Sequence, residues 1–266
     1  MRKNKSSLFL LYLLGAAFLV MILNTNLKMR ARLTKLNDTT IFSDEFRSHE
    51  IGEENLKILK EMQPEDRGTS AALMILGGFE NGEEKLWTSR PAWRAYRDAC
   101  CAIWNEAIYF PVPNSTVHEE YQVHFTDSWM NERTYGGKRG HEGTDLMASK
   151  DVPGLYPVVS ISDGTVMNKG WLERGGYRIG ILSAQGGYYY YAHLDSYADL
   201  EEGDTVCAGD LIGFMGNTGY GEEGTKGMFP THLHIGIYLY PGENEISVNP
   251  YWILRTLEEK KLSCSF

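Results

Sequence analysis

The chain has 266 residues, which is enough for one substantial core and a smaller accessory region. Hydrophobic residues make up 42% of the chain and charged residues 23%, a composition that excludes wholesale disorder. The formal net charge is -9 and no basic patch interleaves with aromatic residues, so we expect no nucleic-acid partner.

An apolar run over residues 8–23 follows Arg2, Lys3 and Lys5. Its length lies between a signal-peptide core and a full membrane span, and no Ala-x-Ala cleavage site follows it. We therefore predict that residues 1–27 form an uncleaved, single-pass membrane anchor; cleavage and secretion are the alternative. Basic residues flank the run on both sides, so the positive-inside rule does not set its orientation.

Residues 28–108 are predicted to form a polar stalk, over about 28–48, and a helical accessory region. Helices are expected over 53–62, 71–75 and 91–108. The last helix carries an apolar stripe that is expected to pack on the domain that follows it or within the accessory region, with partner binding as the alternative. The stripe consists of Trp93, Tyr96, Cys100, Ile103 and Ala107.

From residue 109 onward, short apolar segments alternate with glycine turns. Hairpin turns are predicted at Asp163-Gly164 and Gly186-Gly187, and a last helix over 254–261. The fold class is thus mainly β, with a compact antiparallel β domain over 109–266 behind a small helical region and the anchor. The predicted strands are 158–161, 165–168, 177–182, 188–193, 211–215 and 232–239.

Four of the seven histidines fall in three short motifs. His232 and His234 stand two apart in a predicted strand, so both side chains point to one face. Upstream, His141-Glu142-Gly143-Thr144-Asp145 offers an imidazole and a carboxylate in a loop that leads into a strand. The third motif ends at His193, which is expected to share a strand face with Tyr189 and Tyr191. Two imidazoles and one carboxylate suit zinc and leave a position open for water, which is the catalytic pattern.

The motifs His141-Glu142-Gly143-Thr144-Asp145, Tyr191-Ala192-His193-Leu194, Gly216-Asn217-Thr218-Gly219 and His232-Leu233-His234 occur in one order. Together they resemble the lysostaphin-type (LytM-like) zinc endopeptidases of bacterial cell walls, over residues 110–251. The resemblance implies a duplicated-hybrid-motif-like β domain that hydrolyses peptide bonds in peptidoglycan stem peptides or cross-bridges. It places the domain on the extracytoplasmic side of the membrane.

The resemblance also assigns roles to individual residues. His141, Asp145 and His234 would hold one zinc ion per chain, and His193 and His232 would be the catalytic pair, with the choice of general base left open. Tyr191, Tyr135 and Trp129 are expected to line the substrate groove, with aromatic packing as the alternative for the last two. Glu142 is expected to be a solvated loop residue, because the motif His-Glu-x-x-His is absent.

The stretch 220–230 is longer than the resembled family usually has between its last two motifs. We predict that it forms a groove wall or lid, with a solvated surface loop as the alternative.

Two other functions compete with hydrolysis. A non-catalytic scaffold or activator of other wall hydrolases would not need the five site residues, all of which are present. A biotinyl- or lipoyl-type carrier would need a Met-Lys-Met motif, which is absent. The four cysteines contain no Cys-x-x-Cys pair, so they predict neither a zinc site nor a disulfide framework; a bond between Cys207 and Cys264 stays open.

Overall fold

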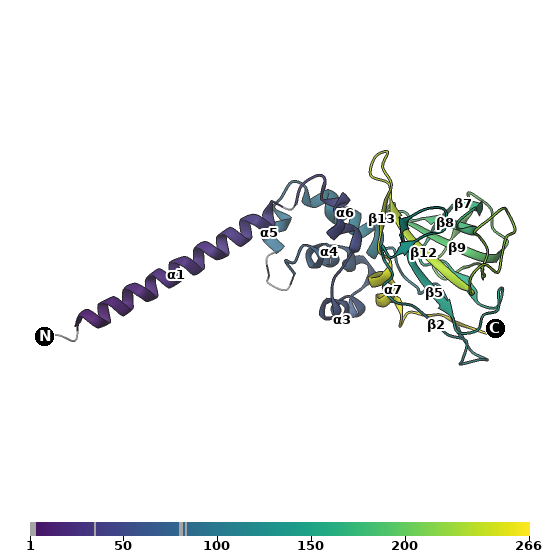
Figure 1. Cartoon of the computed structure of the whole chain (residues 1–266), viewed down its shortest axis with the longest axis horizontal. Coiled ribbons are helices and arrows are strands. Elements are labelled where there is room, and N and C mark those ends of the chain that lie inside the picture. Colours follow the sequence, from purple (N-terminus) through teal and green to yellow (C-terminus); the bar gives the residue numbers. More distant parts are fainter. Residues whose placement is uncertain (1–3, 35, 80–81, 83) are drawn as a thin grey trace.

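The computed structural model describes residues 4–34, 36–79, 82 and 84–266. Helix α1 (Asn4–Leu33) extends away from the rest of the chain as one long rod (Figure 1). Its segment Leu8–Lys28 has a mean hydropathy of 2.2 and buries none of its surface within the chain. This helix is long and apolar enough to cross a membrane, although a signal sequence has the same properties.

Five short helices and one turn of 3-10 helix lie between α1 and the β strands (Figure 1). The structure contradicts the predicted stalk over residues 36–48, because this segment is folded against the β region. Phe46 is fully buried, the Asn249 N–H donates to the Arg47 carbonyl (2.7 Å), and the Arg47 guanidinium donates to Ser247 Oγ (2.9 Å). The elements are η1 (Thr40–Phe42), α2 (Asp44–Ser48), α3 (Glu53–Glu61), α4 (Pro64–Ile75), α5 (Glu84–Thr88) and α6 (Trp93–Trp104).

Helix α6 joins the helical region to the sheet. The helix is shorter than the predicted 91–108, and Ala107 of the predicted apolar stripe lies beyond its end. All five stripe residues are nevertheless buried, so they are not free to bind a partner. The Ile103 carbonyl accepts a hydrogen bond from Tyr189 Oη at 2.6 Å, which ties α6 directly to a central strand. Helix α4 starts earlier than predicted because Pro64 occupies its first turn, where a missing N–H has no cost.

The C-terminal half of the chain is a mainly antiparallel β structure, as predicted. The main path of the largest sheet runs β10-β7-β8-β9-β12-β5-β2, with β11 joining β6 to β9 and β13 pairing with β12. Its strands are β2 (Val123–His124), β5 (Thr144–Ala148), β6 (Pro157–Val159), β7 (Gly164–Leu172), β8 (Gly176–Leu182), β9 (Tyr188–Tyr197), β10 (Thr205–Val206), β11 (Leu211–Met215), β12 (His232–Leu239) and β13 (Ile246–Val248).

Two small pairs and one helix complete the fold. They are the parallel pair β1 (Asn114–Ser115) and β14 (Ser263–Cys264), the hairpin β3 (Glu132–Arg133) and β4 (Arg139–Gly140), and helix α7 (Tyr251–Leu257). Helix α7 starts three residues and ends four residues earlier than the predicted helix over 254–261. All four cysteines are free thiols, so the Cys207–Cys264 bond is not formed.

One of the two predicted hairpin turns is wrong. Gly186-Gly187 does connect the paired strands β8 and β9, with Gly186 at a φ of 93° that glycine adopts without strain. Asp163-Gly164, in contrast, separates β6 from β7, and these two strands pair with other partners. A turn dipeptide reports a change of direction, but it does not determine which strands then pair.

The central strands alternate between a core face and a groove face. Ile179, Ile181, Tyr189, Ile235 and Ile237 are fully buried on one face. This core is continuous with the buried residues of the helical region. The other face is left open to form the floor of a groove, which contains the functional side chains.

Candidate functional site

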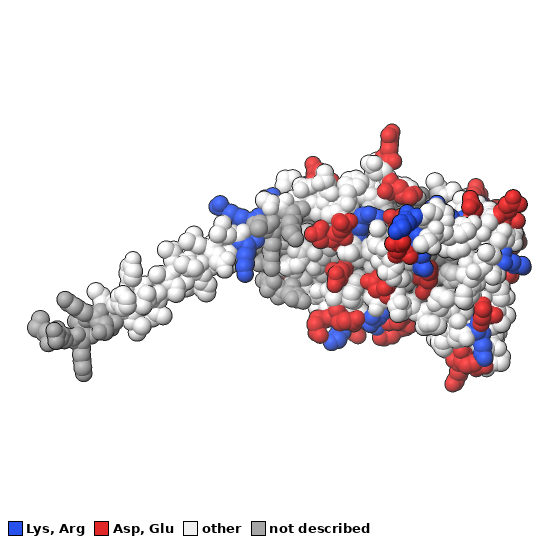
Figure 2. All heavy atoms as spheres, in the orientation of Figure 1, with Lys and Arg blue, Asp and Glu red and all other residues white. Residues whose placement is uncertain are grey.

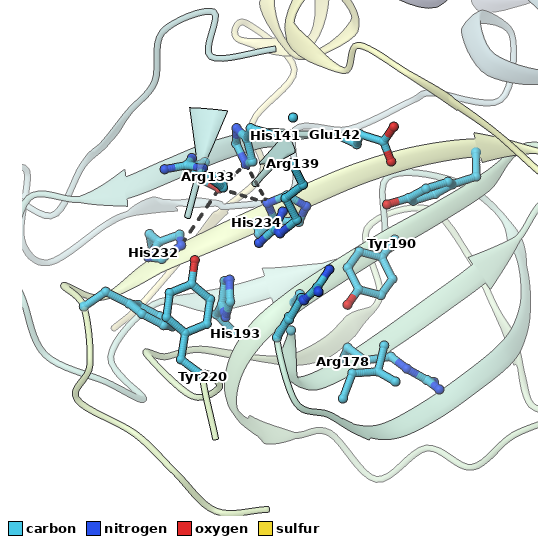
Figure 3. Close-up of a pocket in the computed structure, with 18 of the residues that line it drawn as sticks. Arg133, Arg139, His141, Glu142, Arg178, Tyr190, His193, Tyr220, His232 and His234 are labelled. Atoms are coloured by element: carbon cyan, nitrogen blue, oxygen red, sulfur yellow. Dashed lines mark hydrogen bonds and ion pairs between the residues drawn. The ribbon is translucent and has the colours of Figure 1, made fainter. Parts of the chain in front are cut away.

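Three predicted metal ligands converge at one point of the groove. His234 on β12 and Asp145 on β5 are direct cross-strand partners, and His141 precedes β5 by three residues. Asp145 Oδ1 lies 2.9 Å from His234 Nδ1 and 3.1 Å from His141 Nε2, and these two nitrogens are 3.0 Å apart (Figure 3). Two imidazole nitrogens and a carboxylate oxygen that meet in this way fit a tetrahedral cation with one position free.

The loop before β5 is shaped around this cluster. Any side chain at Gly143 would place its Cβ 2.4 Å from His234 Cε1, so glycine is needed there for His234 to reach its partners. His141 Nδ1 lies 3.2 Å from the Ser128 carbonyl and 3.0 Å from Ser128 Oγ, which fixes the ring and leaves Nε2 for a metal.

Asp145 is held as a carboxylate on both of its oxygens. Oδ2 accepts a 2.6 Å hydrogen bond from Arg133, while Oδ1 faces the two imidazoles. Burial opposes this charge, but the hydrogen bonds with His141 and His234 outweigh it and hold the pKa of the carboxyl far below its usual range. Asp145 is therefore ready to act as an anionic ligand.

His232 and His193 lie beside the cluster with their rings 4.7 Å apart. His232 Nδ1 is 2.8 Å from the Pro230 carbonyl, and His193 Nδ1 is 2.7 Å from the Thr218 carbonyl. A proton on each Nδ1 satisfies these carbonyls and leaves each Nε2 with a free lone pair. Burial lowers the pKa of both imidazoles, so both are neutral near pH 7.

His193 reaches the groove through a break in the strand alternation. It was expected to share a face with Tyr189 and Tyr191, but those tyrosines point into the core. His193 has a φ of 63°, and the register between β8 and β9 shifts beside it, so one extra residue is inserted into β9. The bulge turns the imidazole onto the face that carries His234.

The groove has a volume of about 830 Å³, which is large enough for a peptide segment. Its lining includes the rings of Tyr188, Tyr190 and Tyr238, together with Tyr220 and Phe229 of the 220–230 segment. Glycines make room for these rings: a Cβ at Gly180 would lie 1.8 Å from Tyr188 Oη.

None of the three predicted substrate-binding residues lines the groove. Tyr191 is fully buried, and its hydroxyl accepts a hydrogen bond from the Ile161 N–H at 2.7 Å, so it is a core residue and has no surface for substrate. Tyr135 stacks on Tyr220 at 4.1 Å, behind the groove wall, and the ring of Trp129 lies 5.7 Å from the Arg47 guanidinium. Neither Tyr135 nor Trp129 lines the groove itself.

Tyr188, Tyr190 and Arg178 do line the groove, but the sequence did not predict them as substrate-binding residues. Their strands were predicted, but only the position of the bulge shows which face of β9 is open. Glu142, as expected, is not part of the cluster: its side chain is 46% exposed and pairs with Arg47 at 2.8 Å.

The chain is also similar to proteins of known sequence and structure. The model of peptidase family M23 matches residues 139–250. A candidate glycyl-glycine endopeptidase lytM from Ruminococcus gnavus ATCC 29149 has a solved structure that is 49% identical, covers 88% of this chain and 98% of that chain, and superposes with a TM-score of 0.82.

Two curated proteins match over shorter stretches. The L-Ala--D-Glu endopeptidase of Bacillus subtilis (strain 168) is 41% identical over 150 residues, which are 56% of this chain and 43% of that protein. The glycyl-glycine endopeptidase ALE-1 of Staphylococcus capitis is 34% identical over 116 residues, 39% of this chain and 31% of that protein. The match thus spans less than half the length of either curated relative.

Proposed function

The chain belongs to peptidase family M23, and we propose that it is a zinc-dependent endopeptidase that hydrolyses peptide bonds in peptidoglycan. The observation that carries this proposal is the convergence of His141, Asp145 and His234 beside two neutral histidines in a peptide-sized groove. The names of the curated relatives support a wall peptide as substrate.

Zinc is the metal that this donor set suits best. Two imidazoles and one carboxylate match the ligand types of catalytic zinc sites, and one open position remains. When bound, zinc would act as a Lewis acid and lower the pKa of its water toward about 7. A single negative ligand leaves the site net positive, which favours an oxyanion.

The neighbouring histidines supply proton transfer. Either free Nε2, of His193 or of His232, can accept a proton from the attacking water, and a protonated imidazole can then donate to the leaving amine. The carbonyls of Thr218 and Pro230 hold the two rings in place, so little reorganisation is needed during the reaction. The presence of both histidines and all three ligands weighs against a non-catalytic scaffold.

We also propose that α1 anchors the protein and that the catalytic region faces the extracytoplasmic side, where its wall substrate lies. The apolar surface of Leu8–Lys28 supports the anchor.

The test is digestion of purified peptidoglycan by the full-length protein in detergent, with mass analysis of the fragments and metal analysis of the protein. We expect about one zinc per chain and new peptide ends in the digest. The His234→Ala variant should lose both, while His118→Ala, whose exposed imidazole lies outside the groove, should keep both.

Zinc at the wild-type level in His234→Ala would overturn the ligand assignment. Fully loaded wild-type protein that releases no peptide from any wall preparation would overturn the hydrolase proposal.

A further inference from the structure

The short hairpin β3–β4 places two arginines directly opposite one another beside the three proposed metal ligands. Arg133 and Arg139 are cross-strand partners, and like charges in this position repel each other. Arg133 is compensated, because its guanidinium donates to Asp145 Oδ2 at 2.6 Å. Arg139 makes no ion pair with any residue that the structure describes, and its Nε is shielded from solvent without a hydrogen-bond partner.

A second uncompensated arginine lines the same groove further along the sheet. Arg178 on β8 lies beyond Tyr190 as seen from the metal cluster, and its Nη1 is also buried without a partner among the described residues (Figure 3). Arg174, in contrast, donates to the Gly136 carbonyl at 2.8 Å. Both arginines line the groove and neither has an ion-pair partner among the described residues, so an anionic group on a ligand in the groove would stabilise both side chains.

The carboxylates that line the groove do not neutralise these arginines. Asp145 belongs to the metal cluster, Glu142 pairs with Arg47, and Glu245 interacts with Tyr240. The groove is therefore locally cationic although the whole chain has a formal net charge of -9. A cationic cleft in an acidic protein concentrates anionic ligands at that point only.

We propose that Arg139 binds a carboxylate of the substrate next to the scissile bond, with Arg178 favouring the same charge, so that the groove selects acidic peptides over neutral glycine peptides. The inference rests on the proposed endopeptidase function and decides between the two bond types named for the relatives. Arg139 is two residues before the ligand His141, and its cross-strand partner contacts Asp145, so an anion held there lies beside the metal. A guanidinium matches the two oxygens of a carboxylate with paired hydrogen bonds.

Two synthetic peptides test this preference. They share an L-Ala–D-glutamyl bond and differ only in a free carboxylate or a carboxamide on the D-glutamyl residue. For the zinc-loaded, full-length protein in detergent, kcat/KM should be about tenfold or more higher for the carboxylate peptide. The Arg139→Gln variant should bring this ratio close to one by loss on the carboxylate peptide alone, and Arg178→Gln should lower it less.

The matched control is Arg97→Gln, which removes the same charge from a half-exposed side chain on α6 that pairs with Asp98. It should leave the ratio unchanged. Zinc content and the thermal midpoint of each variant report folding. Arg139→Lys, which keeps the charge without the paired geometry, replaces Arg139→Gln if the latter does not fold.

Binding of both peptides to the His232→Ala protein, measured by calorimetry, separates this inference from the proposed function. A carboxylate preference of the wild-type protein near one, or one that survives in both arginine variants, would overturn the inference even if both peptides are cut. Preferential binding of the carboxylate peptide without cleavage by zinc-loaded wild type would leave the inference standing and overturn the endopeptidase proposal.

Discussion

The proposed catalytic pair consists of two histidines that the backbone holds in place. His193 occupies a left-handed conformation at the bulge in β9, and His232 is tied to Pro230 at the start of β12. We predict that His193→Ala and His232→Ala each lower turnover by about a hundredfold or more, since each removes a proton-transfer group. Both variants should keep zinc, because neither side chain belongs to the cluster of three ligands.

Metal analysis together with turnover on a wall peptide checks this prediction. His124→Ala is the control, because that imidazole is exposed on β2 outside the groove. Near-normal turnover in either variant would remove that histidine from the mechanism.

His49 gives the folded state a specific sensitivity to acid. It is fully buried, stacks on Trp104 with ring centroids 6.2 Å apart, and burial lowers its pKa from 6.5 to about 4. Above pH 6.5 the imidazole is neutral in both states. As the pH falls from 6.5 toward 4, the unfolded chain takes up the proton first, so stability is progressively lost, by about 2 kcal/mol near pH 5.

The His49→Asn variant removes this titration and can keep the left-handed backbone at this position, where φ is 47°. We therefore predict that its thermal midpoint falls less than that of the wild type between about pH 7 and pH 5. The exposed His118→Asn serves as the control and should follow the wild type. Equal pH dependence in all three proteins would contradict a buried neutral His49.

At the scale of the elements, the sequence predicted the ranges of several strands, but it did not predict which distant strands pair. Strands β11 and β12 match their predicted ranges, because each is a short apolar run between turn residues. The bulge at His193 and the partners of β6 depend on hydrogen bonds between distant segments, so the chain itself carries no local signal for them. The folding of residues 36–48 likewise depends on Phe46 and on hydrogen bonds to β13, and not on a helical pattern.

The 220–230 segment contributes Tyr220, Phe229 and Pro230 to the lining of the groove. Tyr220 stacks on Tyr135, and the ring of Phe229 lies 4.6 Å from that of His193 and 5.0 Å from that of His232. The base of the segment is closed by the Gly227 N–H, which donates to the Asn217 carbonyl at 3.1 Å. These contacts support the prediction of a groove wall, because the segment touches both proposed catalytic rings but no metal ligand.

Shortening residues 221–227 should therefore change turnover or peptide preference while leaving the zinc content unchanged. The measurement compares the cleavage of several wall peptides with the metal content of the same preparations. Glu223→Ala, an exposed change within the segment, is the control and should behave as the wild type. If zinc, rate and preference all survive the deletion, the segment is the solvated loop of the alternative interpretation.

For the whole molecule, the helical region and the β region share one core. Buried residues from Leu36 to Leu257 form a single connected cluster, and Phe46 and Tyr189 contribute to it from opposite sides of the proposed boundary. The proposed division into residues 28–108 and 109–266 therefore separates the part with the proposed site residues from the part without them. It does not separate two independent folding units, because both parts share one core. Tests of activity accordingly use the full chain.

The remaining element, α1, buries none of its apolar surface within the chain. Leu8–Lys28 is 21 residues long, which as a helix spans about 31 Å, close to the hydrocarbon thickness of a bilayer. Figure 2 shows a rod without charged side chains over its described middle part and basic side chains where the rod meets the folded body. In the sequence, Lys28 and Arg30 follow the apolar run. In water this apolar surface would be exposed along its whole length, whereas lipid would cover it. A helix satisfies its own backbone hydrogen bonds within the span, so it needs no hydrogen-bond partner from the lipid.

We therefore predict that the mature protein keeps its N-terminus and stays in the membrane fraction after an alkaline wash, which releases proteins held only by charge. Protease added to intact cells stripped of their wall should digest the catalytic region, because the proposed substrate lies outside the membrane. A chain with two arginines in place of Phe18 and Leu19, at the middle of Leu8–Lys28, is the control and should lose membrane retention, since each charge at the centre of a span costs about 2.5–3.5 kcal/mol. Recovery of a soluble mature protein that begins near Asn24 would show instead that the apolar run is a cleaved signal sequence.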